Sequence, residues 1–334
     1  MTKISIALCT YNGAKFLQEQ LESFIEQTRP PDELVVCDDC SQDNTVQIIE
    51  DFSRDAPFPV FLHVNEKNLG STKNFEKAIS LCTGEIIFLS DQDDVWLPHK
   101  IERIEAKFAR EKDVALVFSD AELVDENLKS MGHTLWSVTF SQNNRRDFVN
   151  GKSFEVLLWQ NVVTGATAAF YSKFRQVFMP IPNDIPDLLH DAWIALLIAN
   201  EAKITFIDEP LIKYRQHDSQ QLGVKLGSSL KNDWPGRKKH FAASIKFLQN
   251  EVKRLAQMGE IMNEFPQFEK RRGSISIKSL MGAKKENIKH CEARKNLPLP
   301  RLQRIWPIYR EFITGRYSRI SKGLLSAAKD LLKK

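Results

Sequence analysis

The chain has 334 residues, more than one ordinary domain needs, and fits one large domain with an appendage. Apolar residues make up 42% and charged residues 27%, a globular balance that excludes wholesale disorder, collagen-like repeats and disulfide scaffolds. No uncharged apolar run approaches the roughly 18 residues of a transmembrane helix, and residues 1–7 lack the apolar core of a signal peptide. We therefore expect a cytoplasmic protein.

Charge is distributed unevenly along the chain. Residues 1–224 carry 21 Lys and Arg against 34 Asp and Glu, whereas residues 225–334 carry 26 against 9. The net charge of +4 thus hides an acidic body of −13 and a basic tail of +17. This asymmetry predicts two regions with different tasks, in which the tail meets nucleic acid, an anionic membrane surface or an acidic partner.

The cysteines do not indicate a metal or redox site. An odd, scattered set is typical of a reducing compartment; its members are Cys9, Cys37, Cys40, Cys82 and Cys291. Cys37 and Cys40 form a C-x-x-C, but a zinc site needs a second pair or histidines at ligand spacing, and neither is nearby. We interpret Cys37 as the end of a buried strand and Cys40 as a residue of the following loop.

Strands and helices alternate through the first part of the chain. In chain order we expect a strand at 3–9, a helix at 14–27, a strand at 34–37, a polar loop at 38–45, a helix ending at Phe52, a strand at 60–64, a helix at about 72–82 and a strand at 85–89. The strands are almost continuously apolar. This pattern predicts an α/β fold whose mostly parallel sheet is covered by helices on both faces.

Polar residues follow each of these predicted strands. They are Tyr11-Asn12-Gly13, Asp38-Asp39, Asn68-Leu69-Gly70 and Asp91-Gln92-Asp93-Asp94. Because ligands of parallel sheets bind outside the carboxyl ends of the strands, these residues predict a binding site at one edge. No G-x-G-x-x-G follows the first strand and no P-loop motif occurs, so a classical dehydrogenase or a P-loop NTPase is disfavoured.

Three carboxylates crowd the end of the fourth predicted strand: Asp91, Asp93 and Asp94. Such crowding is electrostatically unfavourable unless a cation or solvent relieves it. Carboxylate and water oxygens suit Mg²⁺ or Mn²⁺, which commonly bridge to phosphates. The cluster predicts a divalent metal site, with a solvated acidic turn as the alternative. Residues 96–98 then close the loop, and a helix is expected to begin near His99.

These motifs resemble those of family 2 glycosyltransferases. The resemblance covers about residues 3–220 and implies the GT-A fold, a Rossmann-like nucleotide-diphospho-sugar transferase fold with a mixed, mostly parallel sheet. The matching residues are Ile6-Ala7-Leu8-Cys9-Thr10-Tyr11-Asn12-Gly13, Val35-Val36-Cys37-Asp38-Asp39-Cys40-Ser41-Gln42-Asp43-Asn44-Thr45, Asn68-Leu69-Gly70 and Leu89-Ser90-Asp91-Gln92-Asp93-Asp94-Val95-Trp96. Residues 90–96, with Tyr214-Arg215-Gln216-His217, are most similar to bacterial rhamnosyltransferases of surface-polysaccharide assembly. Residues 1–224 would form the catalytic domain.

The resemblance also implies roles for individual residues. The nucleotide pocket would be lined by Thr10, Tyr11, Asn12, Asp38, Asp39, Asn68, Gly70 and Lys73. Asp39 would contact the base, with Asp38 beside it. Lys73 would counter phosphate charge, unless it is a solvated helix residue. Asp91 would contact the ribose or the metal shell, and Asp93 would ligate the metal.

Two later segments complete the expected site. Residues 161–170 are predicted to form an apolar strand in which Gly165 either permits close approach of the donor sugar and acceptor or marks a bulge. A helix is expected from about Leu188 to Ala199, with Asp191 in its first turn. Asp191 is either a carboxylate favoured by the helix dipole or, as the resemblance implies, the general base. His190 is a weaker alternative and is interpreted as a neighbour of the site.

Two residues near position 215 are candidates for contacts with the diphosphate. We expect a short strand at 204–207 and a turn at 208–210 before Arg215 and His217. Arg215 could donate charge-assisted hydrogen bonds to the diphosphate. The resemblance suggests His217 as a metal ligand or diphosphate contact, whereas a lone histidine is more often structural.

The predicted mechanism is inverting transfer. The metal, with Arg215 or Lys73, would stabilise the diphosphate leaving group, and Asp191 would take the proton from an acceptor hydroxyl. No glycosidase-type acid is needed, because the diphosphate leaves without protonation. We expect rhamnose to move from dTDP-rhamnose to a glycan or lipid-linked acceptor. Transfer from UDP-glucose, UDP-galactose or a UDP-amino sugar remains open, as does a non-catalytic nucleotide-sugar-binding protein.

The tail at 225–334 differs from the body in its sequence pattern. We expect a loop at 233–240, a helix at 241–262, basic clusters at 270–295, and short helices divided by Pro307, Gly315 and Gly323. Apolar residues recur every three or four positions after residue 300, interspersed with Arg and Lys. This pattern fits docking on an anionic membrane surface, which we place at the cytoplasmic face of the inner membrane, or a helical subdomain with a solvated basic face. The tail has no recognised nucleic-acid motif, so nucleic acid is not expected as a partner.

Overall fold

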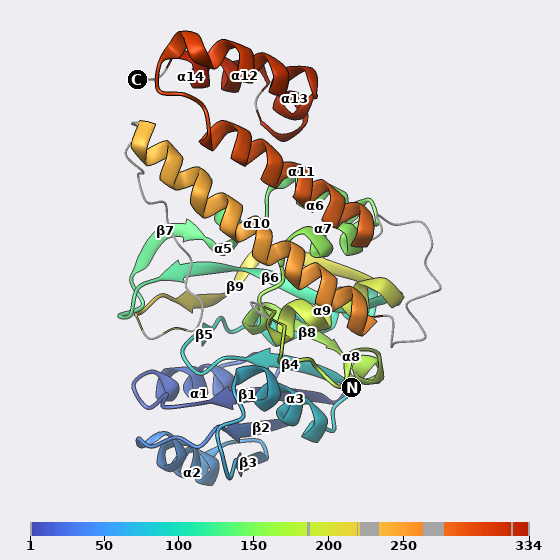
Figure 1. Cartoon of the computed structure of the whole chain (residues 1–334). Helices are drawn as coiled ribbons and strands as arrows, with labels where there is room; N and C mark the ends of the chain where they lie inside the picture. The colour runs from blue at the N-terminus through green and yellow to red at the C-terminus, as the bar shows by residue number, and fades with distance from the viewer. Residues whose placement is uncertain are drawn as a thin grey trace. The chain divides into compact units, whose positions relative to one another are not determined.

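The computed structural model describes residues 2–185, 188–218, 220, 234–262, 277–321 and 323–332 (Figure 1). The chain divides into two compact units. The first comprises Met1–Asp184 with Leu188–Val224, and the second comprises Ile185–Asp187 with Lys225–Lys334. None of the described helices is long and apolar enough to cross a membrane.

The first unit is built on one mixed sheet. Its strands are β1 (Ile4–Thr10), β2 (Glu33–Asp38), β3 (Val60–Val64), β4 (Ile86–Ser90), β5 (Val95–Trp96), β6 (Val114–Val124), β7 (Ser130–Thr134), β8 (Ala168–Tyr171) and β9 (Lys203–Arg215). The order is β3-β2-β1-β4-β8-β6-β9-β5, with β7 paired to β6. Strands β3, β2, β1 and β4 are parallel, as are β6 and β9, while β8 runs antiparallel to β4 and β6. The predicted α/β class is confirmed.

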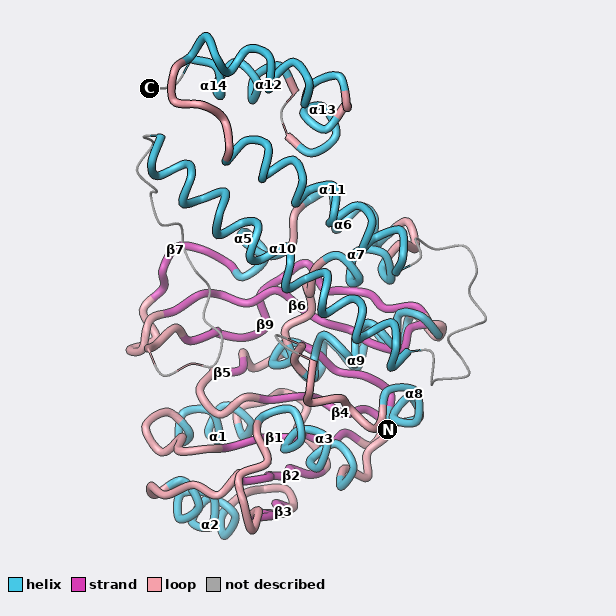
Figure 2. Tube along the Cα trace, in the orientation of Figure 1, coloured by secondary structure: helices cyan, strands magenta, loops and turns pink. Residues whose placement is uncertain are grey.

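Helices cover this sheet (Figure 2). They are α1 (Leu17–Ile25), α2 (Thr45–Asp55), α3 (Ser71–Leu81), α4 (Lys100–Arg110), α5 (Leu135–Thr139), α6 (Gln142–Val149), α7 (Ser153–Trp159), α8 (Arg175–Phe178) and α9 (His190–Glu201). Every residue of β1 and β2 is buried, which explains why their sequences are mostly apolar. Helix α9 is buried on nearly all sides and is apolar all round, as a helix in the interior must be.

Two expectations about local structure in this unit are wrong. The predicted strand at 161–170 is a strand only in β8, because Gly165–Thr167 forms a short 3-10 turn in which the Thr167 N–H bonds the Thr164 carbonyl. The predicted turn at 208–210 lies inside β9, whose pairing with β6 shifts register after Ser119. A bulge absorbs Pro210 without ending the strand.

The cysteines lie as interpreted from the sequence. Cys37 is buried near the end of β2, and Cys40 lies in the following loop with a positive φ of 72°. All five cysteines are free thiols. Burial raises the pKa of Cys37 to about 11 and that of Cys82 to about 12, so these thiols stay protonated at neutral pH.

The second unit is helical, with α10 (Trp234–Met262), α11 (Ile277–Lys295), α12 (Arg301–Ile313), α13 (Arg316–Ile320) and α14 (Leu324–Leu332). The expected loop at 233–240 is wrong from Trp234 onward, because α10 begins there. Pro307 lies inside α12 and does not divide it, whereas Gly315 and Gly323, both at positive φ, do separate helices. Of the expected basic clusters, residues 270–276 lie outside the described residues.

Candidate active site

The end of β2 is organised by two neighbouring aspartates. Asp38 is fully buried and accepts hydrogen bonds from the Thr10 hydroxyl at 2.8 Å and from the Ser41 backbone N–H at 2.8 Å and hydroxyl at 2.6 Å. These contacts fix the turn between β2 and α2. Asp38 therefore helps to fix the shape of the expected nucleotide pocket while lying beneath its surface.

Asp39 holds the loop that follows β3. Its carboxylate accepts from the Asn65 side-chain amide and from the backbone N–H groups of Leu69 and Gly70, each at 2.8 Å. Asn68 donates to the Asp39 carbonyl oxygen at 3.2 Å. Gly70 sits at a φ of 80°, which favours glycine over any residue with a side chain. The structure thus joins Asp39, Asn68 and Gly70, three residues that the sequence placed in the nucleotide pocket.

The turn after β1 is tied to the turn after β4. Gln92 accepts from the Tyr11 N–H at 2.8 Å and donates to the Tyr11 carbonyl at 3.0 Å. Asn12, at a φ of 47°, receives the Gln42 N–H and donates its own N–H to Ser41. The Tyr11 side chain is left half-exposed. Gln92 thus joins the loop after β1 to the loop after β4. The sequence did not single it out, because nothing in an amide among three aspartates indicates this contact.

A group of carboxyls with raised pKa values follows β4. Burial, followed by the charges of Asp93 and Asp191, raises the pKa of Asp91 to about 7. Burial and the neighbouring charges of Asp93 and Asp91 likewise raise the pKa of the fully buried Asp94. One Asp94 oxygen accepts the Arg215 backbone N–H at 3.0 Å, and the other has no hydrogen-bond partner. The predicted crowding is therefore present in three dimensions.

Lys100 is a buried cation next to these carboxyls. Its ammonium group bonds the Ala166 carbonyl and lies 3.6 Å from the centre of the Trp96 ring. Its positive charge lowers the pKa values of Asp91 and Asp94, while burial lowers its own. In sequence Lys100 looks like an ordinary surface residue at a helix start, so nothing there could have identified it.

Arg215 and His217 lie at the end of β9 beside Asp93. The His217 imidazole is 2.9 Å from the Asp93 carboxylate. The buried Arg215 guanidinium donates to the Asp93 carbonyl at 2.7 Å, to the Glu126 carbonyl and to the Glu19 carboxylate. Through these contacts Arg215 holds the acidic loop, and its expected contact with a diphosphate stays a prediction. Glu19 was not foreseen.

Asp191 occupies the first turn of α9, as expected. Its carboxylate accepts the Gly165 N–H at 3.0 Å, the Asn161 side-chain amide at 3.2 Å and the Ala192 N–H at 2.6 Å. Burial raises its pKa to about 6, against the opposing effect of these hydrogen bonds. The turn that holds Asp191 also holds Lys100, because the Ala166 carbonyl, next to Gly165, accepts a hydrogen bond from the Lys100 ammonium.

His190 and Lys73 lie differently from the other candidates. The His190 ring stacks on Phe75 with ring centres 3.8 Å apart, its nitrogens have no partner, and burial lowers its pKa to about 3. It is a neutral residue of the interior. The Lys73 ammonium is 3.0 Å from the Glu76 carboxylate, in a pocket between α3 and the Met179-Pro180 bond.

A metal ion would find a partial set of ligands. Within the described residues, no group of three or more His, Cys, Asp or Glu side chains is arranged to hold one. Asp93 and His217 are paired, and Asp91 carries a raised pKa that a cation would relieve. Carboxylate and imidazole suit Mn²⁺, and carboxylate suits Mg²⁺, with phosphate or water oxygens completing the shell. The residues present fit such a shared site.

The mixed sheet gathers acidic loops at the carboxyl ends of its strands, where sheets of this kind bind their ligands. Residues 5–172 match the profile described as "Glycosyl transferase family 2". The chain belongs to glycosyltransferase family 2.

Several known proteins are similar to the chain. An uncharacterised glycosyltransferase of Nostoc is 34% identical over 132 residues, which are 39% of this chain and 39% of the relative. The dTDP-rhamnosyl transferase RfbG of Shigella flexneri is 27% identical over 237 residues, covering 67% of this chain and 76% of that protein. Among solved structures, a mannosyltransferase from Pyrobaculum calidifontis in complex with GDP-Man and Mn²⁺ covers 98% of this chain and 77% of its own, with 18% identity and a TM-score of 0.52. The likeness confirms the GT-A fold.

Proposed function

We propose that the protein is an inverting, metal-dependent transferase that moves rhamnose from dTDP-rhamnose to a hydroxyl of a glycan or lipid-linked acceptor in surface-polysaccharide synthesis. The observation that carries this proposal is that the turn at Gly165 and Ala166 joins two parts of the site. The Gly165 N–H holds the buried Asp191 carboxylate, and the Ala166 carbonyl holds Lys100, whose charge acts on Asp91. A buried base in the same site as a cation is what direct displacement of a diphosphate requires. The choice of donor rests on the similarity to the Shigella flexneri enzyme.

In this proposal the donor nucleotide occupies the ends of β1, β2 and β3. The base lies along the loop that Asp39 holds, with Asn68 and Gly70 on one side and Tyr11 on the other. Backbone groups fixed by Asp38, Thr10 and Asn12 shape the pocket without needing to reach the ligand. Lys73 would reach the phosphates only after leaving Glu76, which lies 3.0 Å away.

The diphosphate end of the donor would lie at the acidic loop. A divalent ion held by Asp93 and His217, with Asp91 near its shell and phosphate or water oxygens completing it, would supply Lewis-acid stabilisation of the leaving diphosphate. The chain's own contribution is to hold that loop. Arg215 does so through the Asp93 carbonyl, and Lys100 offsets part of the negative charge that gathers there.

Asp191 would remove the proton from the acceptor hydroxyl. The Gly165 N–H and the Asn161 amide orient its carboxylate, and burial keeps its pKa high enough for it to act as a base near neutral pH. The acceptor oxygen then attacks the anomeric carbon from the face opposite the diphosphate, so the configuration inverts. Gly165 leaves room beside Asp191 because it has no side chain.

A donor-hydrolysis screen tests this function. Purified protein is incubated with Mg²⁺ or Mn²⁺ and a panel of nucleotide sugars, and released nucleotide is measured. We expect release chiefly from dTDP-rhamnose. Release chiefly from UDP-glucose, UDP-galactose or a UDP-amino sugar would keep the transferase and replace the donor. Absence of both hydrolysis and metal-dependent binding for every donor would overturn the proposal.

A further inference from the structure

Helix α12 carries a stripe of large apolar side chains that face solvent. Leu302 and Trp306 are 83% and 66% exposed, and Ile305, Tyr309 and Ile313 are each more than half exposed. Their spacing places all five on one face of the helix at about 100° per residue. Such a continuous apolar surface is uncommon on a protein that stays alone in water, and it marks an interaction site.

Helix α14 adds to the exposed apolar surface of the same unit. Leu324, Leu325 and Leu332 are each more than half exposed, and so is Leu299 just before α12. Helices α12 and α14 pack against each other. We call the exposed apolar residues of α12 and α14 together the apolar tip.

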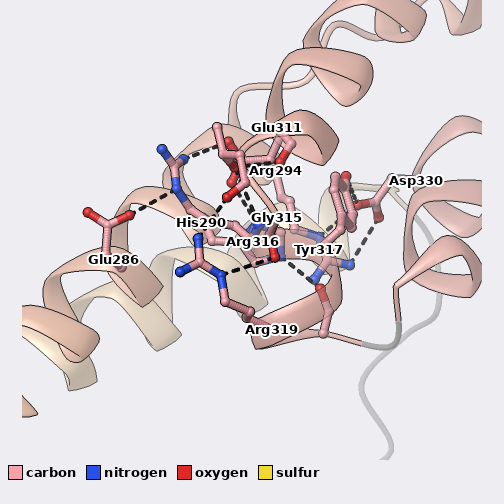
Figure 3. Close-up of polar contacts among 11 residues, drawn as sticks. Glu286, His290, Arg294, Glu311, Gly315, Arg316, Tyr317, Arg319 and Asp330 are labelled. Carbon is pink, nitrogen blue, oxygen red and sulfur yellow. Dashed lines mark hydrogen bonds and ion pairs between the residues drawn. The ribbon is translucent and has the colours of Figure 1, made fainter.

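The face of α12 opposite the stripe is buried, and it is held by ion pairs (Figure 3). Glu311 accepts from His290 at 2.8 Å and from Arg316 at 2.7 Å. Arg304, also buried, donates to the backbone carbonyls of residues 298, 299 and 330. Rolling the helix to hide its stripe would pull these charges out of their partners, so the stripe stays outside.

Asp330 fixes α14 in the same way. It accepts from Arg294 at 2.7 Å and from the Tyr317 hydroxyl at 2.7 Å, and it is fully buried. Tyr317 in turn belongs to a small apolar core with Leu297 and Ile308. The unit therefore has charged residues inside and apolar residues outside on these two helices.

The exposed charged side chains around the apolar tip are all basic, because the acidic residues of this stretch are buried. Glu311 and Asp330 are the two acidic residues between positions 301 and 332, and both are buried and paired. The exposed charged side chains described in this stretch are basic, and they are Arg301, Arg310, Arg319 and Lys329. On α12, Arg301 and Arg310 flank the stripe on its two sides at helical spacing.

We propose that the apolar tip docks the protein on the surface of an anionic lipid bilayer. A bilayer surface offers apolar material at its headgroup boundary and negative charge around it, which matches an apolar stripe bordered by Arg. Trp306 and Tyr309 would sit at the headgroup level. A second copy of the chain would bring the same positive charges together, and nucleic acid would leave the stripe in water. This docking is independent of the proposed sugar transfer.

Vesicle flotation of the full-length protein tests the docking. We expect the chain to float with vesicles that contain phosphatidylglycerol, to stay behind with phosphatidylcholine alone, and to lose binding as salt rises. Leu302→Gln with Trp306→Gln should weaken the partition by about tenfold or more, because two apolar side chains return to water. Arg301→Glu with Arg310→Glu should weaken it by about tenfold or more on anionic vesicles.

Matched controls keep the result interpretable. Val149→Gln removes an apolar side chain of the first unit that is 76% exposed, and Lys67→Glu with Lys112→Glu reverses two exposed charges there. Both should float like the unchanged protein, and unfolding midpoints should match for all variants. The proposal is overturned if the unchanged protein fails to float, if the tip variants float equally well, or if they convert a dimer to a monomer without changing flotation.

Discussion

Both units of the molecule bury acidic side chains, yet they treat them in opposite ways. In the second unit, Glu311 and Asp330 are each matched by a cation at hydrogen-bond distance. In the first, the half-buried Asp91 and the buried Asp94 crowd one loop, Lys100 offsets only part of their charge, and one Asp94 oxygen has no hydrogen-bond partner. Fully paired charge organises a fold, whereas partly compensated charge is costly and is kept where a ligand completes it. The comparison therefore predicts that charge removal costs activity in the first unit and stability in the second.

The largest effect is expected at Asp191. Replacing it by Asn keeps the shape and a hydrogen-bond acceptor for the Gly165 N–H but removes the base. Transfer should fall by about 10²–10⁴-fold while donor binding changes little. Steady-state kinetics with acceptor and calorimetric donor titration separate the two quantities.

Asp208→Asn is the matched control, because that aspartate is exposed and pairs with Arg145 on the surface. It should transfer normally. Near-normal turnover of the Asp191 variant would remove Asp191 from the chemistry and would leave the proposed mechanism without a base.

Breaking the second unit's buried pair should act on stability alone. Asp330→Ala leaves Arg294 and Tyr317 without their partner inside the unit. We expect the free energy of unfolding of this unit to fall by about 3 kcal/mol or more. Chemical denaturation measures the loss, and donor hydrolysis should stay unchanged.

Asp55→Ala, at an exposed aspartate of α2, is the control and should shift the free energy of unfolding by less than about 0.5 kcal/mol. Loss of donor hydrolysis in the Asp330 variant at a temperature where it is folded would contradict the division of roles between the two units.

A pH profile sharpens the assignment of the base. Asp191 accepts a proton only when it is ionised, and burial raises its pKa to about 6. Below that pH the value of kcat/KM should fall by about tenfold per unit, and above it the value should level off. Asp191→Glu alters the burial of the carboxyl, so it should shift the pH below which kcat/KM falls. Activity that stays flat through pH about 6 would speak against the carboxyl as base.

The sequence predicted the fold of the first ninety or so residues well because its signals there are local. Strand β3 falls at the expected residues, and α3 and β4 begin within a residue of the expected positions. Apolar runs and turn residues are enough to predict the fold where a strand is buried and its neighbours follow in chain order.

The prediction of the later part of this unit was wrong where a contact between residues distant in sequence determines the local structure. The turn at Gly165 is one in which the Gly165 N–H also bonds the distant Asp191, and Pro210 stays in a strand whose pairing with β6 shifts register there.

The residues of the site divide in the same way. The aspartates were proposed as site residues because carboxylates at strand ends stand out in any sequence. Lys100, Glu19 and Gln92 were missed, since their importance comes from partners far along the chain. Long-range partners also hold the buried Arg215 against the acidic loop, a contact that the sequence did not indicate.

The smallest effect is expected where the Gln92 side chain joins the loop after β4 to the loop after β1 through the Tyr11 backbone. We call this pair of hydrogen bonds the clamp. A Cβ on Gly13 would lie 2.2 Å from the Gln92 side-chain oxygen, so Gly13→Ala must displace the Gln92 side chain from Tyr11. We expect donor KM to rise by about fivefold, roughly the value of one or two hydrogen bonds. Gln92→Ala removes the same clamp and should cost about as much. Because the side chain that clashes is then gone, the double variant should be no worse than either single one, which a double-mutant cycle detects as non-additivity. Additive losses would mean that Gly13 acts through its own backbone and that the loops are joined by other contacts.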